Sequence, residues 1–141
     1  MLEGFEELKN IYNEFYNQLV EKFESLYITK IDDLENNAPE ILKSYINKVL
    51  SGKKYNIREL IFNNEIGRKY VKEMQNKFIK HSIKLVPFEY KIFNDLVILP
   101  NKVLITQFKN NRLFGVVIKS KSISMKLKAL FAWVWKNSEE L

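Results

Sequence analysis

The sequence predicts an α/β sandwich, in which a mixed β-sheet lies between two layers of helices. Three observations support this fold class. Helix-like and strand-like segments alternate along the first half of the chain, and several short strand-like segments precede a last helix. The apolar run 113–118 leads through a polar turn into an amphipathic helix, a unit that must pack against a sheet. With 141 residues, 46% of them hydrophobic, the whole chain 1–141 is expected to form one domain.

The first helix is predicted over residues 3–23. Its apolar positions recur at steps of three and four, as Phe5, Leu8, Tyr12, Phe15, Leu19 and Phe23. Further apolar residues widen this stripe, so the helix is expected to meet more than one surface. Residues 26–31 follow as the first strand, because they are mostly apolar and too few for a stable helix.

A polar turn is predicted over residues 32–39, with Asn37 as the cap of a second helix. This helix should run to about Leu50, where Gly52 stops it. Residues 57–62 predict the second strand. Asn63 or Asn64 is then expected to cap a third helix, whose inward residues would be Ile66, Tyr70, Met74 and Phe78.

Four strand-like segments close the sheet, at 83–86, 96–99, 103–108 and 113–118. Turns at Pro100-Asn101 and Asn110-Asn111 separate the last three. Ser120 offers a side-chain oxygen to the first N–H groups of the final helix. The inward positions of that helix are predicted as Ile123, Leu127, Leu130, Phe131 and Val134.

The net charge of +6 is unevenly distributed along the chain. Residues 1–40 hold ten acidic and three basic residues, whereas residues 41–141 hold seven acidic and twenty basic ones. A basic surface is one feature of nucleic-acid-binding proteins, but scattered lysines are also typical of solvated surfaces. Only Arg58, Arg68 and Arg112 could make bidentate contacts with guanine, so the sequence offers little for base-specific recognition.

Several classes of chemistry lack the residues they need. The chain has no cysteine, and no apolar run reaches the roughly 18 to 20 residues of a membrane span. His81 is the only histidine, and four separate glycines form no phosphate-binding loop. The sequence therefore predicts a soluble cytoplasmic protein without catalytic residues, metal or cofactor, and without membrane contact.

Polar residues follow the first two predicted strands. Asp32 and Asp33 come after the first, and Asn63 and Asn64 after the second. Loops at the carboxyl ends of strands are the usual ligand sites of α/β sheets. A solvated turn that caps the next helix is the competing interpretation.

Trp133 stands about 60° outside the inward stripe of the last helix on a helical projection. Large apolar side chains outside a core often mark a contact with another molecule. Trp133, together with Phe5 and Tyr12 of the first helix, is therefore predicted to form a subunit interface.

Near the end of the chain, the strand-like residues 101–105 and 113–118 are followed by Ser120 and Ile123, and then by Leu130-Phe131 and Trp135 in an F-x-x-x-W spacing. This combination resembles the end of the effector domain of TrmB-type transcriptional regulators. Upstream, residues 3–12, 57–60 and 67–70 match the family's opening helix, second strand and third helix in the same order. The similarity spans nearly the whole chain, but it consists mainly of apolar patterns.

This resemblance implies a phospholipase D-like sandwich without phospholipase chemistry, used to sense a small molecule such as a sugar and to dimerise a DNA-binding regulator. Family members carry a winged helix-turn-helix ahead of this domain, whereas Met1 here falls at its start. The chain is therefore expected to be a stand-alone sensor or part of a larger regulator, with a winged-helix protein as partner. The family's acidic position after the last strand is Lys119 here, which is a departure.

The same fold analogy raises one enzymatic possibility. Phospholipase D enzymes use His-x-Lys followed four residues later by Asp, whereas this sequence reads His81-Ser82-Ile83-Lys84. The extra residue turns the lysine to the opposite face of a strand. The leading hypothesis is thus a non-enzymatic effector-binding or dimerisation domain that acts as a homodimer. Its ligand would be held by Asp32, Asp33, Asn63 and Asn64, with Tyr27 or Tyr55 stacked on a sugar face. A nucleic-acid-binding protein and a structural homodimer are the alternatives.

Overall fold

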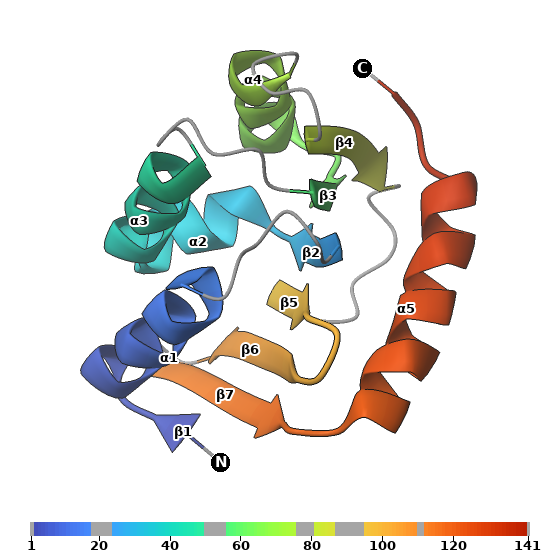
Figure 1. Ribbon diagram of the computed structural model, residues 1–141. Helices are drawn as coiled ribbons and strands as arrows, with labels where there is room; N and C mark the ends of the chain where they lie inside the picture. The colour runs from blue at the N-terminus through green and yellow to red at the C-terminus, as the bar shows by residue number, and fades with distance from the viewer. Residues whose placement is uncertain are drawn as a thin grey trace.

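The computed structural model shows an α/β sandwich with a seven-stranded sheet between two helical layers (Figure 1). It describes residues 2–17, 24–49, 56–75, 81–86, 95–109 and 112–140. The elements are β1 (Leu2–Glu3), α1 (Phe5–Asn17), β2 (Glu24–Thr29), α2 (Ile31–Asn37), α3 (Pro39–Val49), β3 (Asn56–Phe62), α4 (Glu65–Met74), β4 (His81–Val86), β5 (Asp95–Ile98), β6 (Val103–Lys109), β7 (Arg112–Ile118) and α5 (Lys121–Lys136).

The sheet is mixed, as predicted. Its strand order is β1-β7-β6-β5-β2-β3-β4. The strands β2, β3 and β4 are parallel, and β5, β6, β7 and β1 continue the sheet in antiparallel pairs. The predicted Asn110-Asn111 turn lies outside the described residues, but Lys109 pairs with Arg112 on either side of it. Because β2 and β3 are neighbouring parallel strands, the segments that follow them begin at the same edge of the sheet.

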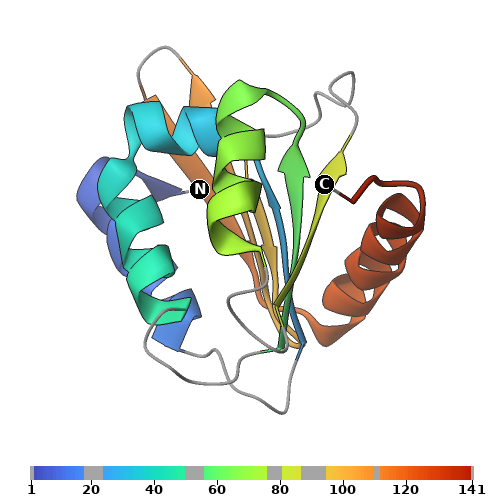
Figure 2. The ribbon, with the colours of Figure 1, turned by 90° about the horizontal axis from the view of Figure 1, so that it is seen from above.

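The two faces of the sheet are covered differently. Figure 2 shows α1, α2, α3 and α4 on one face and α5 alone on the other. A large core lies under the four helices and includes Leu8, Phe15, Ile41, Val71 and Val97. A smaller core lies under α5 and includes Leu26, Leu60, Val86, Ile98 and Phe131.

One helix is long enough to cross the whole face. The 16 residues of α5 span about 24 Å at about 1.5 Å per residue. The five strand spacings from β7 to β4, at about 4.8 Å each, give a similar length. Two backbone hydrogen bonds between Leu85 and Glu139, of 2.7 and 3.0 Å, then fix the segment after α5 to the edge strand β4. The helix therefore crosses all six strands from β7 to β4, and it does not follow any one of them.

The inward face of α5 is rotated relative to the prediction. Phe131 is buried, but Ile123 and Leu130 are exposed, so their placement in the inward stripe is wrong. Trp135 takes the inward position instead, with its ring 5.9 Å from that of Phe131 at an interplanar angle of 19°. The Arg58 guanidinium lies 5.5 and 5.3 Å from the centres of these two rings. Because of this cation–π contact, the side of α5 that carries Phe131 and Trp135 faces the sheet, and Leu130 faces outward.

Two other predictions near the N-terminus need correction. Residues 32–39 form most of α2, not a turn, and the Asn37 side chain donates to the Asp33 carbonyl at 2.8 Å instead of capping the next helix. The first helix begins at Phe5, after Gly4 with φ +106° separates it from a short strand. The predicted cap Ser120 is confirmed, as is Asn64 for α4.

Candidate functional site

The carboxyl edge of β2 and β3 brings together the polar residues predicted for a ligand. Asn64 Nδ2 donates to Asp32 Oδ1 at 2.9 Å, and Asn64 Oδ1 accepts from the Gly67 N–H at 2.8 Å. Lys30 Nζ lies 3.7 Å from Asp32 and 3.4 Å from Asp33. These groups therefore pair with one another through hydrogen bonds and ion pairs, in a network that joins α2 to the start of α4.

The other predicted ligand residues are placed less favourably. Asn63 accepts a hydrogen bond of 2.8 Å from Arg68 at the surface. The Tyr27 side chain is buried beneath the helices, so the prediction that it stacks on a bound sugar is wrong. Tyr55 lies outside the described residues. The structure thus confirms the proximity of Asp32 and Asn64 and leaves their binding role untested.

A buried carboxylate that sequence reasoning missed lies at the same edge. Thr29 Oγ1 donates to Asp95 Oδ1 at 2.7 Å, and the Tyr12 hydroxyl donates to Asp95 Oδ2. The Tyr12 oxygen also shares a hydrogen bond of 2.7 Å with Thr106 Oγ1. Burial raises the pKa of Asp95 to about 6, while the hydrogen bonds from Tyr12 and Thr29 oppose the rise. Donors from α1 and β2 thus hold this carboxylate inside the protein.

This arrangement corrects the predicted subunit interface. Tyr12 is 1% exposed and uses its hydroxyl inside the chain, so its assignment to the interface is wrong. Phe5 is half-buried against the same core. Trp133 is 63% exposed, which confirms its place outside the inward stripe of α5. The interface role of Phe5 and Trp133 stays a prediction.

A second buried carboxylate, Glu59, lies on β3 under α4. It accepts a hydrogen bond of 2.8 Å from the Tyr70 hydroxyl. Burial raises the pKa of Tyr70 well above its ordinary value, and the charge of Glu59 raises it further. Glu59 alternates with Ile57 and Ile61, which both belong to the core under the four helices. That period-two pattern is the sequence signal that places the carboxylate on this face.

Buried tyrosines fill the space between the two carboxylates. Their rings contact one another in the pairs Tyr12–Tyr16, Tyr16–Tyr45 and Tyr45–Tyr27, with centroids 5.9, 5.3 and 5.0 Å apart. Burial, and then the nearby carboxylates, raises the pKa of each of the four well above its ordinary value. The side chains of this polar layer are closed to solvent. We therefore regard it as part of the core.

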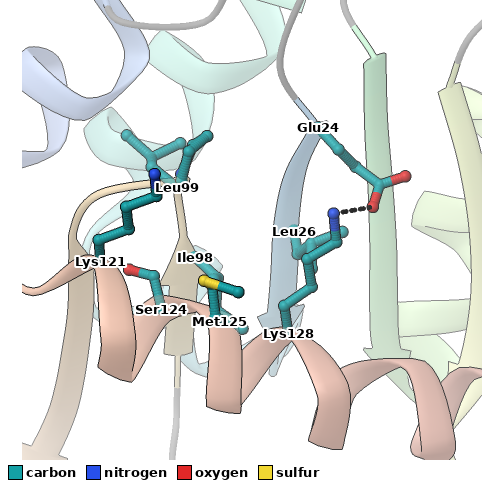
Figure 3. Close-up of a pocket in the computed structure, with 9 residues that line it drawn as sticks. Glu24, Leu26, Ile98, Leu99, Lys121, Ser124, Met125 and Lys128 are labelled. Atoms are coloured by element: carbon teal, nitrogen blue, oxygen red, sulfur yellow. Dashed lines mark ion pairs between the residues drawn. The ribbon is translucent and has the colours of Figure 1, made fainter.

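A pocket of about 270 Å³ lies on the other face, beneath the first half of α5 (Figure 3). Its floor is apolar and comes from β2, β5 and the turn after β5, while its wall comes from α5. The Ser124 side chain points from the helix toward the part of the pocket occupied by Lys121 and Leu99. The lining residues are Glu24, Leu26, Ile98, Leu99, Pro100, Lys121, Ser124, Met125 and Lys128.

The polar groups of the pocket differ in whether they have a hydrogen-bond or ion-pair partner. Glu24 accepts hydrogen bonds of 3.0 and 2.6 Å from Arg58 and lies 3.7 Å from Lys128. The Ser124 hydroxyl is buried and has no hydrogen-bond partner. Ser124 shares the inward side of α5 with Leu127 and Phe131 at steps of three and four, a pattern that the sequence already contains.

His81 and Lys84, which were compared with the phospholipase D motif in the sequence, both lie on the edge strand β4. His81 begins β4, opposite Ile57 near the start of β3, at the amino edge of the parallel strands. Lys84 is held under α5, where its Nζ donates to the Trp135 carbonyl at 3.2 Å and lies 4.9 Å from the centre of the indole ring. Among the described residues, no three His, Cys, Asp or Glu side chains gather in a way that would hold a metal ion.

The outer face of α5 is both apolar and basic. Trp133 and Leu130 are 63% and 61% exposed, and Ile123 is exposed as well. Between residues 119 and 136 the sequence has five lysines and no acidic residue. No helix in the described parts of the chain is long and apolar enough to cross a membrane.

Solved structures with the same arrangement identify the fold. Nuc, a phospholipase D family member from Salmonella typhimurium, superposes with a TM-score of 0.66 at 11% identity, over 94% of this chain and 90% of that one. NucT from Helicobacter pylori gives 0.59 at 10% identity, over 94% and 92%. The chain has a phospholipase D-like fold.

The archaeal chromatin protein TrmBL2, whose structure shows a novel mode of DNA binding, is a third match. Its TM-score is 0.60 at 17% identity, over 99% of this chain and 52% of TrmBL2. This phospholipase D-like chain thus spans about half the length of that protein. No protein-family model and no curated protein sequence matches it. The likeness in fold to a TrmB-type protein agrees with the resemblance found in the sequence.

Proposed function

We propose that this protein is a non-enzymatic effector-binding domain of the TrmB type, which acts on transcription together with a DNA-binding segment or partner. The observation that carries the proposal is the pocket under α5. It combines an apolar floor, two lysines and a buried hydroxyl without a partner. Small-molecule sites commonly have this composition, with mostly apolar walls and a few polar groups that orient the ligand.

The likeness to TrmBL2 supports the regulatory part of the proposal. Nearly all of this chain corresponds to about half of TrmBL2, which is described as a chromatin protein with a novel mode of DNA binding. We infer that a DNA-binding segment or a winged-helix partner supplies the contact with DNA. Ligand binding to this domain would then change how the DNA-binding segment or partner binds DNA.

The position of the basic residues supports a non-enzymatic role, although the fold is shared with Nuc and NucT. Lys84 is held by the Trp135 carbonyl and ring, on the face covered by α5. Arg58 is held by Glu24 and by the aromatic rings of α5. Phosphoryl-transfer enzymes direct such cations at a bound phosphate, whereas these two stabilise the attachment of α5.

Ligand binding is tested by a thermal-shift screen with neutral sugars, sugar phosphates, nucleotides and small organic acids. A ligand at a hundred times its dissociation constant stabilises the folded state by about 2.7 kcal/mol. For a domain of this size the melting temperature should rise by several degrees. A flat response across the whole panel would contradict the proposal.

A second candidate function, nucleic-acid binding, is favoured by the outer face of α5. Lysines there would neutralise phosphates, and the exposed Trp133 ring would stack on a base. The test is gel retardation of single-stranded and duplex DNA at increasing salt. Lys126→Gln should weaken binding and reduce the salt dependence, whereas Lys43→Gln on α3 makes the same charge change on the other face. Lack of retardation at low salt would remove this candidate.

The same outer face is also our proposed contact between two copies of the chain. Trp133 and Leu130 together present a large apolar surface beside one another on α5. Sedimentation equilibrium should show a dimer that Trp133→Ala converts to a monomer. An unchanged mass would assign Trp133 to another role.

A further inference from the structure

The pocket under α5 contains two hydrogen-bond donors that have no partner. Ser124 is 2% exposed, and its hydroxyl makes no hydrogen bond, not even to the Ser120 carbonyl one turn earlier. That carbonyl accepts from the Ser124 N–H at 3.0 Å. Lys121, one turn before Ser124 on the same wall, forms no ion pair or hydrogen bond among the described residues. A buried hydroxyl without a partner is destabilising. The hydroxyls of Tyr27 and Tyr45 are also unpartnered but lie in the closed core, whereas Ser124 lines a pocket in which a ligand can complete it.

The charges around these two donors favour an anion. Both lie in the first two turns of α5, where the helix dipole and the N–H groups left free by the helix favour negative charge. Glu24 is the one carboxylate among the lining residues, and Arg58 already holds it through two hydrogen bonds. Lys128 forms an ion pair of 3.7 Å with Glu24, and its largely exposed side chain adds a second positive charge at the pocket.

The other lining residues and the volume of the pocket indicate the size and polarity of the rest of the ligand. Leu26, Ile98 and Met125 provide an apolar surface on both sides of the pocket. A volume of about 270 Å³ is smaller than a typical drug-sized site. A neutral sugar needs several donors and acceptors around its ring, whereas the unpartnered groups here are one hydroxyl and one ammonium, and the ammonium can only donate. An acid with a small apolar body fits this combination better.

We propose that this pocket binds a small organic anion. Its carboxylate or phosphate group lies between the Lys121 ammonium and the Ser124 hydroxyl, and its apolar part packs against Leu26, Ile98 and Met125. This inference rests on the proposed function and names the chemical class of the effector. It also moves the ligand from the predicted carboxyl edge of β2 and β3 to the opposite face of the sheet.

Binding is tested with pairs of probes, in which one member carries an anionic group that the other lacks. Benzoate is compared with benzamide, phenyl phosphate with phenol, and glucose 6-phosphate with glucose, each by calorimetric titration and thermal shift. The benzoate and phenyl phosphate arms distinguish a carboxylate from a phosphate effector. Each anion that binds should bind more weakly as salt is increased, because salt screens the lysines.

The methionine methyl groups report where a probe binds. Among the chain's three methionines, Met125 lines the pocket and Met74 is buried under α4 on the opposite face. With methyl-labelled methionine, a bound anion should shift the Met125 resonance and leave that of Met74 unchanged. Binding that leaves Met125 unchanged would place the ligand elsewhere and overturn the inference.

Two pairs of variants test the donors. Ser124→Ala should weaken anion binding roughly tenfold, because a hydrogen bond to a charged group is lost. Without ligand, the same variant should be as stable as the wild type or more stable, since an unsatisfied hydroxyl is removed. Ser122→Ala, an exposed position on the same helix, is its control. Lys121→Gln should weaken binding by about the same factor, with Lys43→Gln on α3 as the control of equal charge change.

The outcomes separate this inference from the proposed function. Binding of neutral sugars but no anion would leave an effector-binding domain and overturn the anionic ligand. Anion binding that responds equally to Lys121→Gln and Lys43→Gln would also overturn it, because general electrostatic attraction would then be sufficient. Failure of every probe at millimolar concentration would overturn both.

Discussion

The two faces of the sheet differ in how completely helices cover their polar groups. Under α1–α4, the carboxylates Asp95 and Glu59 receive hydrogen bonds from Tyr12, Thr29 and Tyr70. Under α5, the hydroxyl of Ser124 has no partner and Lys121 lines the pocket beside it, whereas Trp133 is exposed on the outer side of the helix. The difference follows from coverage, because four helices close one face, whereas one helix crosses the other and leaves a pocket beside it. The closed face is therefore structural, and the face under α5 is where we expect binding.

The largest expected change in stability comes from removing the buried ring that attaches α5 to the sheet. Phe131→Ala should destabilise the protein by about 3 to 5 kcal/mol, because the ring is buried and supports both Trp135 and Arg58. Trp133→Ala, two positions along the same helix, should change the stability of the monomer by less than about 0.5 kcal/mol, measured at concentrations below those at which two copies associate. Urea denaturation measures both. Equal effects would show that α5 is attached through a different face.

The next effect concerns the pH dependence caused by Asp95. Its pKa is about 6 in the folded protein against an ordinary value of 3.8, so the folded state binds this proton more tightly than the unfolded state. Ionisation of Asp95 is thus destabilising above pH 6, and this effect disappears as the pH falls from 6 to 4. Relative to Asp95→Asn, the wild type should gain on the order of 3 kcal/mol from pH 7 to pH 4. Parallel pH profiles of the two proteins would contradict this.

A smaller change in stability is expected when a tyrosine hydroxyl on the closed face is removed, and its size should depend on whether that hydroxyl has a hydrogen-bond partner. Tyr12→Phe should cost about 1 to 3 kcal/mol, because the buried Asp95 carboxylate loses a donor. Tyr27→Phe should be neutral or stabilising, since the Tyr27 hydroxyl is buried without a partner. The free energies of unfolding of the two variants provide the comparison. A larger cost for Tyr27→Phe would mean that its hydroxyl has a partner, such as a buried water.

The smallest effect tests whether the predicted ligand residues at the carboxyl edge are structural. Asn64→Ala should destabilise by about 1 kcal/mol, because Asn64 caps α4 and also donates to Asp32. Asn63→Ala removes only an exposed contact with Arg68 and should have little effect. Thermal unfolding measures both. If Asn63→Ala costs as much as Asn64→Ala, the cap is not what holds this edge together.

Local patterns predicted the elements that depend on neighbouring residues alone. Ser120 and Asn64 cap their helices as expected, because a cap requires only a side-chain oxygen three residues before an N–H group. Short apolar runs located the strands within a few residues, except for the short β1. The expected turn over residues 32–39 was wrong because Ile31 and Leu34 are buried, and this packing stabilises α2 despite its many polar residues.

The candidate site shows where such reasoning stops. Asp32 and Asn64 were expected near each other because parallel strands end at one edge, and they are. Their pairing with each other was not foreseen, nor was the pocket, because its residues come from β2, β5 and α5 and meet only after the sheet has formed. The burial of Tyr12 and Tyr27 was missed for the same reason, since an amphipathic pattern does not say how many layers cover it.

The sequence by itself determined the α/β class, the mixed sheet, the last helix and the outward position of Trp133, because these follow from hydrophobic period and capping within short segments. The tertiary structure alone decided which side of α5 meets the sheet and which polar groups are paired. Arg58 and Phe131 are 73 positions apart in the sequence, yet their contact helps set the rotation of α5 and with it the direction of Ser124. Such contacts depend on long-range packing geometry, which no local pattern encodes.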